Sequence, residues 1–283
     1  MTLRRLAVLC AAAISASGCS PSPDTTPQLE LATYDYEDFA RLDCAQGERS
    51  GPAGRVNGAQ AIAGIRFNLR TPSNYDATRA HPLLVVYAAA THSAAGSERF
   101  TGLTREATGR GLIVAYVESR PLSRRMIRVL AEIPGIIEKD WCIDHARIYL
   151  TGHSDGATAS AAIVFLGDID LNPGALAISA PGIRQIDLAQ YDCPAPLPAL
   201  IMQQAHDELF PGYAAELATW FAACNRCKTT MRPPDGRCFD YEDCQVGGRT
   251  RFCETDGTHR QWPGLNTEML EFLSNAPSTL KAR

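Results

Sequence analysis

Two features are scarce in this sequence of 283 residues, and each limits what the protein can do. Beyond the first 20 residues there is no apolar run long enough to span a bilayer, so we expect no later transmembrane helix. Blocks of like charge are also missing, because the 27 basic and 31 acidic residues are intermixed. A nucleic-acid partner would require a basic patch, and we do not expect one. No internal repeat is present, which favours one sizeable domain.

The first residues form a pattern typical of a secretory signal. Arg4 and Arg5 precede an apolar stretch over 6–14, and small residues then lead to Cys19. The apolar stretch is too short for a stable membrane-spanning helix. We therefore expect residues 1–18 to be a signal peptide and the protein to be exported.

A lipid anchor is expected directly after this signal. Residues 16–19 read Ala-Ser-Gly-Cys and resemble the lipobox of bacterial lipoproteins, although Ala16 stands where leucine is usual. We expect Cys19 to be lipidated, a disordered tether over 19–41 and a single domain over 42–283. Membrane contact would then occur only through the anchor, in the cell envelope. The alternative is a freely secreted or periplasmic protein.

Cysteine usage agrees with export. Ten cysteines are present, and an even number of them falls in the expected domain, which indicates up to four disulfide bonds. Five lie within 224–253, a segment with little apolar periodicity, so we expect a loop excursion held by disulfides. A zinc knot on Cys224, Cys227, Cys238 and Cys244 is the alternative, but its spacing is irregular. The cysteines expected in disulfides are Cys44, Cys142, Cys193, Cys224, Cys227, Cys238, Cys244 and Cys253.

Strand-like and helix-like segments alternate along the domain. Apolar runs over 83–87 and 112–117 are typical of parallel strands that are covered on both faces. Residues 65–69 alternate as a half-buried antiparallel strand would. This alternation predicts the α/β class, with a mostly parallel central sheet flanked by helices and active groups at the carboxyl ends of the strands. Further strands are expected over 148–150, 175–178 and 199–202, and helices over 97–111, 121–139, 157–162, 213–223 and 267–274.

The most informative segment is 152–156, with the sequence Gly-His-Ser-Asp-Gly. An apolar run precedes it and a small-residue helical stretch follows, which is the setting of a G-x-S-x-G nucleophile elbow. A serine needs exposure and a neighbouring base to act as a nucleophile, and this turn would expose Ser154. The N–H of Asp155 would point to the place where an oxyanion forms. An ordinary strand-to-helix turn is the plainer alternative.

A serine nucleophile needs a base and an acid that orients the base. With this elbow the usual chain order is serine, then acid, then histidine, and only His206 and His259 follow Ser154. Asp207 comes just after an expected strand and is our choice for the acid, with Glu208 as its competitor. His259 precedes the last helix and is our choice for the base.

Three further residues are expected to line the substrate pocket. His92 lies in the loop after the strand over 83–87, and Trp262 follows the loop of His259. Trp262 would flank an acyl or aromatic group, or it would only pack. His153 lies inside the elbow, where substrate contact and an internal hydrogen-bonding role are both open.

From about Cys44 to Phe272 the chain resembles the extracellular polyhydroxybutyrate depolymerase and feruloyl esterase group of α/β-hydrolases, which includes lipoproteins. The most specific marker is 257–264, Gly-Thr-His-Arg-Gln-Trp-Pro-Gly, which is similar to the Gly-Gly-His-x-Trp-Pro-Gly loop of that group. The resemblance implies the α/β-hydrolase fold, without cofactor or metal. It also implies nucleophile, acid and base roles for Ser154, Asp207 and His259. Other markers are Tyr75-Asp76, Thr101-Gly102-Leu103, Cys142-Ile143-Asp144 and the elbow itself.

One departure concerns the oxyanion hole. The group usually has His-Gly after the strand over 83–87, whereas residues 88–91 here read Ala-Ala-Ala-Thr. The backbone N–H groups of Ala89 and Ala90 would still donate. The resemblance implies an exported serine ester hydrolase acting on small-molecule or oligomeric esters through an acyl-enzyme. The alternatives are a serine peptidase and a non-catalytic surface lipoprotein on the same fold.

Overall fold

The structure is a computed structural model. It describes residues 26–36, 44–231 and 237–276. The expected signal peptide over 1–18 and the expected lipidation site at Cys19 lie outside the described residues, so both stay predictions. Within the described residues, no helix is long and apolar enough to cross a membrane.

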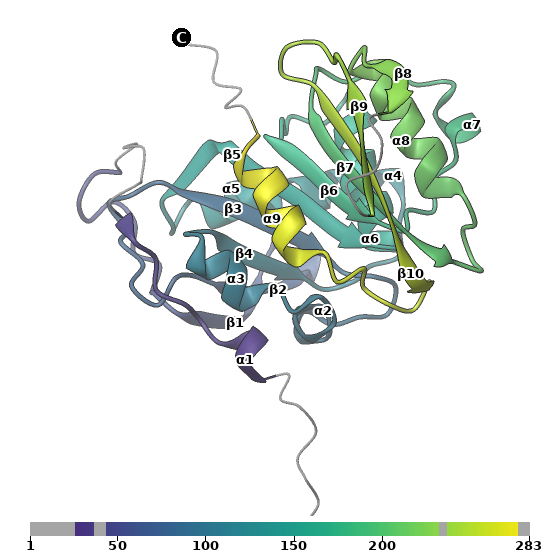
Figure 1. Ribbon diagram of the computed structural model, residues 1–283. Helices are drawn as coiled ribbons and strands as arrows, with labels where there is room; N and C mark the ends of the chain where they lie inside the picture. Colours follow the sequence, from purple (N-terminus) through teal and green to yellow (C-terminus); the bar gives the residue numbers. More distant parts are fainter. Residues whose placement is uncertain (1–25, 37–43, 232–236, 277–283) are drawn as a thin grey trace, which may run out of the picture.

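Ten strands form one sheet in the order β1-β2-β4-β3-β5-β6-β7-β10-β9-β8 (Figure 1). The strands from β4 to β10 in this order pair in parallel, whereas β1, β2, β8 and β9 pair antiparallel. This confirms the expected mostly parallel central sheet. The strands are β1 (Arg55–Gln60), β2 (Arg66–Arg70), β3 (His81–Tyr87), β4 (Ile113–Val117), β5 (Ile143–His153), β6 (Ala175–Ser179), β7 (Pro198–His206), β8 (Lys228–Met231), β9 (Cys238–Glu242) and β10 (Arg249–Thr258).

Helices cover both faces of the sheet (Figure 1). One apolar cluster packs α4, α5, α6 and α8 against one face, and a second packs α2, α3 and α9 against the other. The sheet is therefore buried on both sides, as the continuous apolar runs in its strands require. The helices are α1 (Thr26–Leu29), η2 (Ile62–Gly64), α2 (Ala94–Thr101), α3 (Thr104–Gly109), α4 (Arg124–Ala131), α5 (Ile133–Ile137), α6 (Asp155–Phe165), α7 (Gln185–Leu188), α8 (Tyr213–Cys224) and α9 (Asn266–Ser274).

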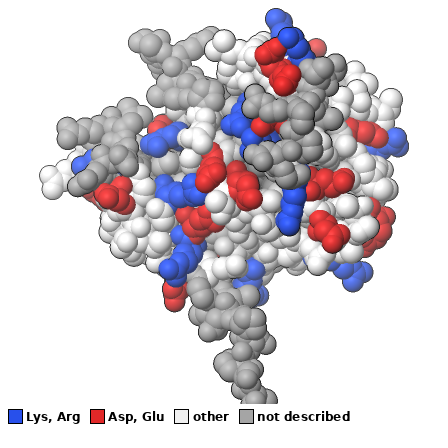
Figure 2. All heavy atoms as spheres, in the orientation of Figure 1, with Lys and Arg blue, Asp and Glu red and all other residues white. Residues whose placement is uncertain are grey.

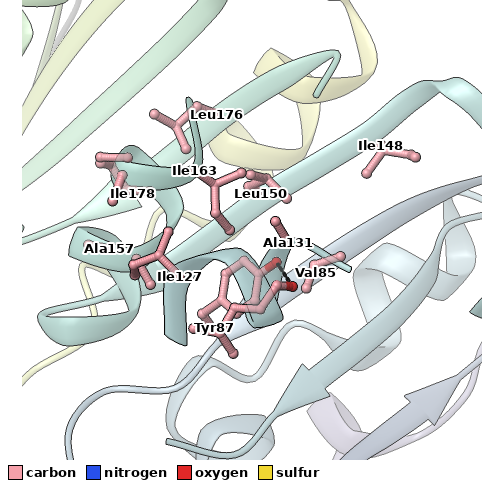
Figure 3. Packing of buried hydrophobic residues seen from close by; sticks show 14 of the residues in the cluster. Val85, Tyr87, Ile127, Ala131, Ile148, Leu150, Ala157, Ile163, Leu176 and Ile178 are labelled. Carbon is pink, nitrogen blue, oxygen red and sulfur yellow. Dashed lines mark hydrogen bonds between the residues drawn. The ribbon is translucent and has the colours of Figure 1, made fainter. Parts of the chain in front are cut away.

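The first cluster holds helix α6, which follows Ser154, in place. Figure 3 shows Ala157 and Ile163 of α6 facing side chains of β3, β5 and β6 and of helix α4. Tyr87 of β3 reaches across this cluster, and its buried hydroxyl donates to the carbonyl of Leu130 at 2.9 Å. Burial of an apolar side chain stabilises the fold by about 1.5–3 kcal/mol. The packing of Ala157 and Ile163 therefore holds α6 against the sheet, where β5 ends.

Two expected elements differ in detail. The single helix expected over 97–111 is two helices, because the chain turns at Gly102, whose φ of 61° only glycine adopts readily. Strand β2 is antiparallel as expected but is not half-buried, since Arg70 on its polar face is 3% exposed. The Arg70 guanidinium donates to both carboxylate oxygens of Glu98, at 2.7 and 2.6 Å, and this pairing permits its burial.

The cysteine-rich segment lies before His259 as expected, but it is not a loop. It forms the strands β8 and β9 and the start of β10, which extend the sheet beyond β7. All eight described cysteines are paired, which confirms the disulfide prediction and indicates folding in an oxidising compartment. The zinc-knot alternative fails because all four of its cysteines are disulfide-bonded. The bridges are Cys44–Cys142, Cys193–Cys224, Cys227–Cys244 and Cys238–Cys253.

Residues 26–36 belong to the stretch expected as a tether, yet they lie along the domain (Figure 1). The N–H of Ala32 donates to the Thr108 hydroxyl at 2.9 Å, and the Tyr36 hydroxyl lies 3.2 Å from Nε2 of the buried His81. Apolar and hydrogen-bonding contacts of this kind are not visible in the composition of a short polar segment.

Candidate active site

The segment 152–156 forms a sharp turn between β5 and α6. Ser154 has φ 55° and ψ −118°, a conformation that a residue with a side chain rarely adopts. The flanking glycines make the turn possible. A Cβ at Gly156 would lie 2.0 Å from the Tyr87 carbonyl oxygen, and one at Gly152 would lie 2.5 Å from the Gly156 backbone. The expected elbow is therefore present, and the ordinary turn is not what the structure contains.

Ser154, His259 and Asp207 form a chain of hydrogen bonds. The Ser154 Oγ lies 2.9 Å from Nε2 of His259, and Nδ1 of His259 lies 2.8 Å from Oδ2 of Asp207. The acid is buried, while the serine is partly exposed. The residues come from the ends of β5, β7 and β10, so the sheet brings together three positions that are far apart in the sequence.

The Asp207 carboxylate is held as an anion. Burial alone would raise the pKa of Asp207, but hydrogen bonds from His259 and from the backbone N–H groups of Leu209 and Phe210 outweigh burial. The pKa of Asp207 therefore lies below its ordinary value, and the carboxylate is charged at neutral pH. A buried anion of this kind orients the imidazole and would stabilise it after protonation.

The two competing residues lie elsewhere. The Glu208 carboxylate accepts the backbone N–H of His259 at 3.5 Å and does not reach the ring. His206 is exposed and faces Asp256, at 3.3 Å. The structure thus brings Asp207 and His259, rather than Glu208 and His206, to Ser154.

The backbone N–H groups expected in the oxyanion hole follow β3 and β5, which are neighbouring strands of the sheet. The N–H of Asp155 begins α6 and has no acceptor within its own helix. Among the described residues, no acceptor takes the N–H of Asp155, Ala89 or Ala90. The loop of these alanines is pinned where the His92 N–H donates to the Ala89 carbonyl at 3.1 Å. These donors are available to an oxygen that develops negative charge.

Aromatic rings pack against His259 and against its neighbour His153. His92 packs edge-on against Phe100, with ring centroids 5.2 Å apart, and Phe100 lies 6.2 Å from Trp262. Phe210 packs edge-on against His259 at 5.1 Å. His92 and Trp262 thus belong to one ring cluster through Phe100, and their role as pocket residues stays a prediction. Phe100 and Phe210 are neighbours that the sequence did not indicate, because neither belongs to a motif and both are positioned only by the folded chain.

His153 does not face the substrate region with a free nitrogen. The ring is 4% exposed; its Nδ1 lies 3.1 Å from the Ser179 hydroxyl and its Nε2 lies 2.6 Å from the His259 carbonyl oxygen. Of the two roles left open by the sequence, this geometry favours the internal hydrogen-bonding role. Burial lowers the pKa of His153 to about 4, against the opposing effect of the hydrogen bond to His259.

In the ranges that the structure describes, no three His, Cys, Asp or Glu side chains are grouped as metal ligands. On the face shown in Figure 2, basic and acidic side chains are interspersed. The Arg110 guanidinium pairs with both Glu106 and Glu271, at 3.0 and 3.6 Å.

Solved structures resemble this arrangement, although no sequence-family model and no curated protein sequence match the chain. The acetyl xylan esterase from Aspergillus awamori superposes with a TM-score of 0.60 at 13% identity, covering 79% of this chain and 99% of that one. The Bacillus cereus carboxylesterase gives 0.54 at 13% identity, covering 76% and 96%. Thermogutta terrifontis esterase 2, phosphonylated by cyclosarin, gives 0.54 at 14%, covering 78% and 90%.

At these identities the likeness concerns the fold. The parallel sheet, the helices on both faces and the strained elbow between β5 and α6 are the features that define it. The chain has the α/β-hydrolase fold.

Proposed function

We propose that the protein is a serine carboxylic ester hydrolase in which Ser154 is the nucleophile, His259 the base and Asp207 the orienting acid. The observation that carries the proposal is the hydrogen-bonded chain from Ser154 through His259 to Asp207, with the serine at the tip of a strained elbow. The proposal is supported by two esterases of similar fold, whose structures align over 79% and 76% of this chain.

Acylation follows from the geometry. His259 Nε2 takes the Ser154 proton while Oγ attacks the ester carbonyl carbon. The carbonyl oxygen becomes an oxyanion, which the N–H groups of Asp155, Ala89 and Ala90 stabilise. The tetrahedral intermediate expels the alcohol oxygen, which receives the proton from His259. An acyl group then remains on Oγ of Ser154.

Deacylation repeats these roles with water. His259 Nε2 removes a proton from water, whose oxygen attacks the acyl carbon, and the same N–H groups hold the second oxyanion. Collapse of this intermediate breaks the bond to Ser154 Oγ, which regains its proton from His259. The carboxylic acid leaves and the enzyme returns to its starting state, with Asp207 charged throughout.

Substrate and location are finer parts of the proposal. Motifs similar to those of the polyhydroxybutyrate depolymerase and feruloyl esterase group favour short acyl, hydroxyacyl or hydroxycinnamoyl esters, small or oligomeric. Aromatic rings packed against His153 and His259 support an apolar acyl or aryl group near the serine. Four disulfides support an exported enzyme, and we propose a cell-envelope lipoprotein anchored at Cys19.

The test compares the wild-type protein with Ser154→Ala on p-nitrophenyl acetate, methyl ferulate and a peptide p-nitroanilide. We expect ester hydrolysis by the wild type only, and stoichiometric labelling of Ser154 by a phosphonate that reacts with activated serines. Hydrolysis of the peptide substrate alone would favour a peptidase. No turnover and no labelling would favour the non-catalytic alternative.

A further inference from the structure

Three buried polar side chains lie behind the Ser154–His259 pair. His153 ends β5, Ser179 ends β6 and Gln204 belongs to β7, the next strand of the sheet. Ser179 and Gln204 are fully buried and His153 is nearly so. Burial of polar groups lowers stability unless they are hydrogen-bonded, and none of the three takes part in the reaction steps above.

The hydrogen bonds between them have one consistent direction. A carbonyl oxygen only accepts, so Nε2 of His153, 2.6 Å from the His259 carbonyl, carries the proton. The neutral ring then accepts at Nδ1 from the Ser179 hydroxyl, 3.1 Å away. Having donated its one proton, Ser179 Oγ accepts from the Gln204 amide at 3.3 Å. The donors thus lead from Gln204 through Ser179 and His153 to the backbone of His259.

This chain holds the loop that carries the base at two points. The Gln204 amide also donates to the Gln261 carbonyl at 2.5 Å, two residues beyond the carbonyl that His153 holds. The same loop begins where β10 ends, at Thr258, and extends to the start of α9. Few backbone–backbone hydrogen bonds fix this loop, so the hydrogen bonds from His153 and Gln204 contribute much of its anchoring.

Ser179 ties the same loop to the nucleophile. Its backbone carbonyl accepts the N–H of Ser154 at 3.0 Å, while its hydroxyl belongs to the chain that ends on His259. Ser179 at the end of β6 therefore helps to fix the positions of both Ser154 and His259. Displacement of a reacting group by about 1 Å lowers the rate on the order of 100-fold, so a residue that fixes both positions matters for catalysis.

We propose that His153 is a positioning residue. In its Nε2–H tautomer, with which the hydrogen bonds of Ser179 and Gln204 agree, it holds the His259 carbonyl and thereby sets the distance between Ser154 Oγ and His259 Nε2. The kinetic consequence rests on the proposed ester hydrolysis. The tautomer and the hydrogen bond do not.

Two substitutions of His153 separate position from packing. His153→Phe keeps the ring volume but removes the donor, and His153→Gln places an amide donor near the position of Nε2. Ser179→Ala interrupts the chain one step earlier and guards against a His153 variant that fails to fold. The double variant His153→Phe/Ser179→Ala tests whether the two residues act as one unit.

With p-nitrophenyl acetate we expect kcat of His153→Phe to fall about 10- to 100-fold, with KM within about twofold of wild type. His153→Gln should recover most of this loss, and the double variant should be no slower than His153→Phe. If His153 only packs, His153→Phe should lower the melting temperature and leave kcat unchanged, and His153→Gln should not restore the stability.

A second measurement does not require activity. In the ¹⁵N NMR spectrum of histidine-labelled wild-type protein at pH 7, we expect His153 as the Nε2–H tautomer. The low-field proton signal of the His259 Nδ1–H···Asp207 hydrogen bond should be sharp. That signal should broaden or shift in His153→Phe and return in His153→Gln.

The outcomes separate the two proposals. An Nδ1–H tautomer of His153, or a His153→Phe protein with kcat within twofold and an unchanged His259 signal, would overturn the positioning role. If the wild type shows no Ser154-dependent hydrolysis, the proposed function fails, and the NMR result alone decides whether His153 positions His259.

Discussion

The imidazole Nε2 of His259 lies 2.9 Å from Oγ of Ser154, although 105 residues separate the two in the sequence. The serine follows β5 and the histidine follows β10, with β6 and β7 between these strands in the sheet. The distance therefore depends on the register of four parallel strands. An error of a single residue in any of these pairings would move the two groups several ångströms apart.

Removal of any of the three reacting side chains should abolish most of the hydrolysis. We expect Ser154→Ala and His259→Ala to lower kcat for p-nitrophenyl acetate by about 10³-fold or more, and Asp207→Asn by less. Glu208→Gln is the matched control, because its carboxylate does not reach the His259 ring. Equal losses in Asp207→Asn and Glu208→Gln would contradict the assignment of the acid.

The elbow should not tolerate a methyl group at Gly156. A Cβ there would lie 2.0 Å from the Tyr87 carbonyl oxygen, so Gly156→Ala should lower the free energy of unfolding by about 3 kcal/mol or prevent folding. At Gly167 a Cβ would meet no atom within 4 Å, and Gly167→Ala should be close to neutral. Urea unfolding of both variants checks the difference, and comparable stability would mean that the backbone relaxes.

Acidification should destabilise the fold through His153. Its pKa is about 4 in the folded protein and near 6.5 when unfolded, so the unfolded chain binds the proton first as the pH falls. Above pH 6.5 the free energy of unfolding is unaffected by His153. As the pH falls from 6.5 to 4, protonation of His153 in the unfolded chain lowers the free energy of unfolding by an amount on the order of 3 kcal/mol.

The comparison that isolates this effect is wild type against His153→Gln, in urea unfolding from pH 7 to pH 4. Asp207, His259 and His92 also affect the pKa of His153, and all three are present in both proteins. We expect the wild type to lose more stability than the variant over this range. Parallel curves would show that His153 does not titrate as its burial requires.

The disulfides should differ in their effect on stability. In the chain-entropy model, the Cys44–Cys142 bridge, with a sequence separation of 98, contributes about 4–5 kcal/mol, and Cys238–Cys253, with a separation of 15, about 3 kcal/mol. Each bridge joins one fully buried and one partly buried cysteine, so paired alanine variants are matched in burial. Denaturant unfolding of both variants gives the ranking, and a larger loss for the shorter loop would contradict the entropic origin.

Much of the site was accessible from the sequence because its signals are local. A serine between two glycines, after an apolar run and before small helical residues, can be recognised as an elbow within a dozen residues. The order of acid and histidine after that serine led to Asp207 and His259, and the structure brings these three residues together. The cysteine count, together with the expected export, predicted up to four bridges without their pairing.

Other features were decided only by the tertiary structure. The strands of the cysteine-rich segment are held by disulfides and by pairing with neighbouring strands, which their weak apolar periodicity did not reveal. Phe100 and Phe210 reach the site from segments that carry no motif. The two nitrogens of His153 acquire their partners from β6 and from the loop after β10.

The division has a physical reason. Turn geometry, strand periodicity and chain order depend on residues near one another in the sequence, so the sequence by itself determined the elbow, the sheet class and the residues to test. Hydrogen bonds and ring contacts across 26 or 106 positions, such as those of His153 with Ser179 and His259, depend on strand register and helix packing. Only the folded chain could decide that the ring nitrogens of His153 face the Ser179 hydroxyl and the His259 carbonyl.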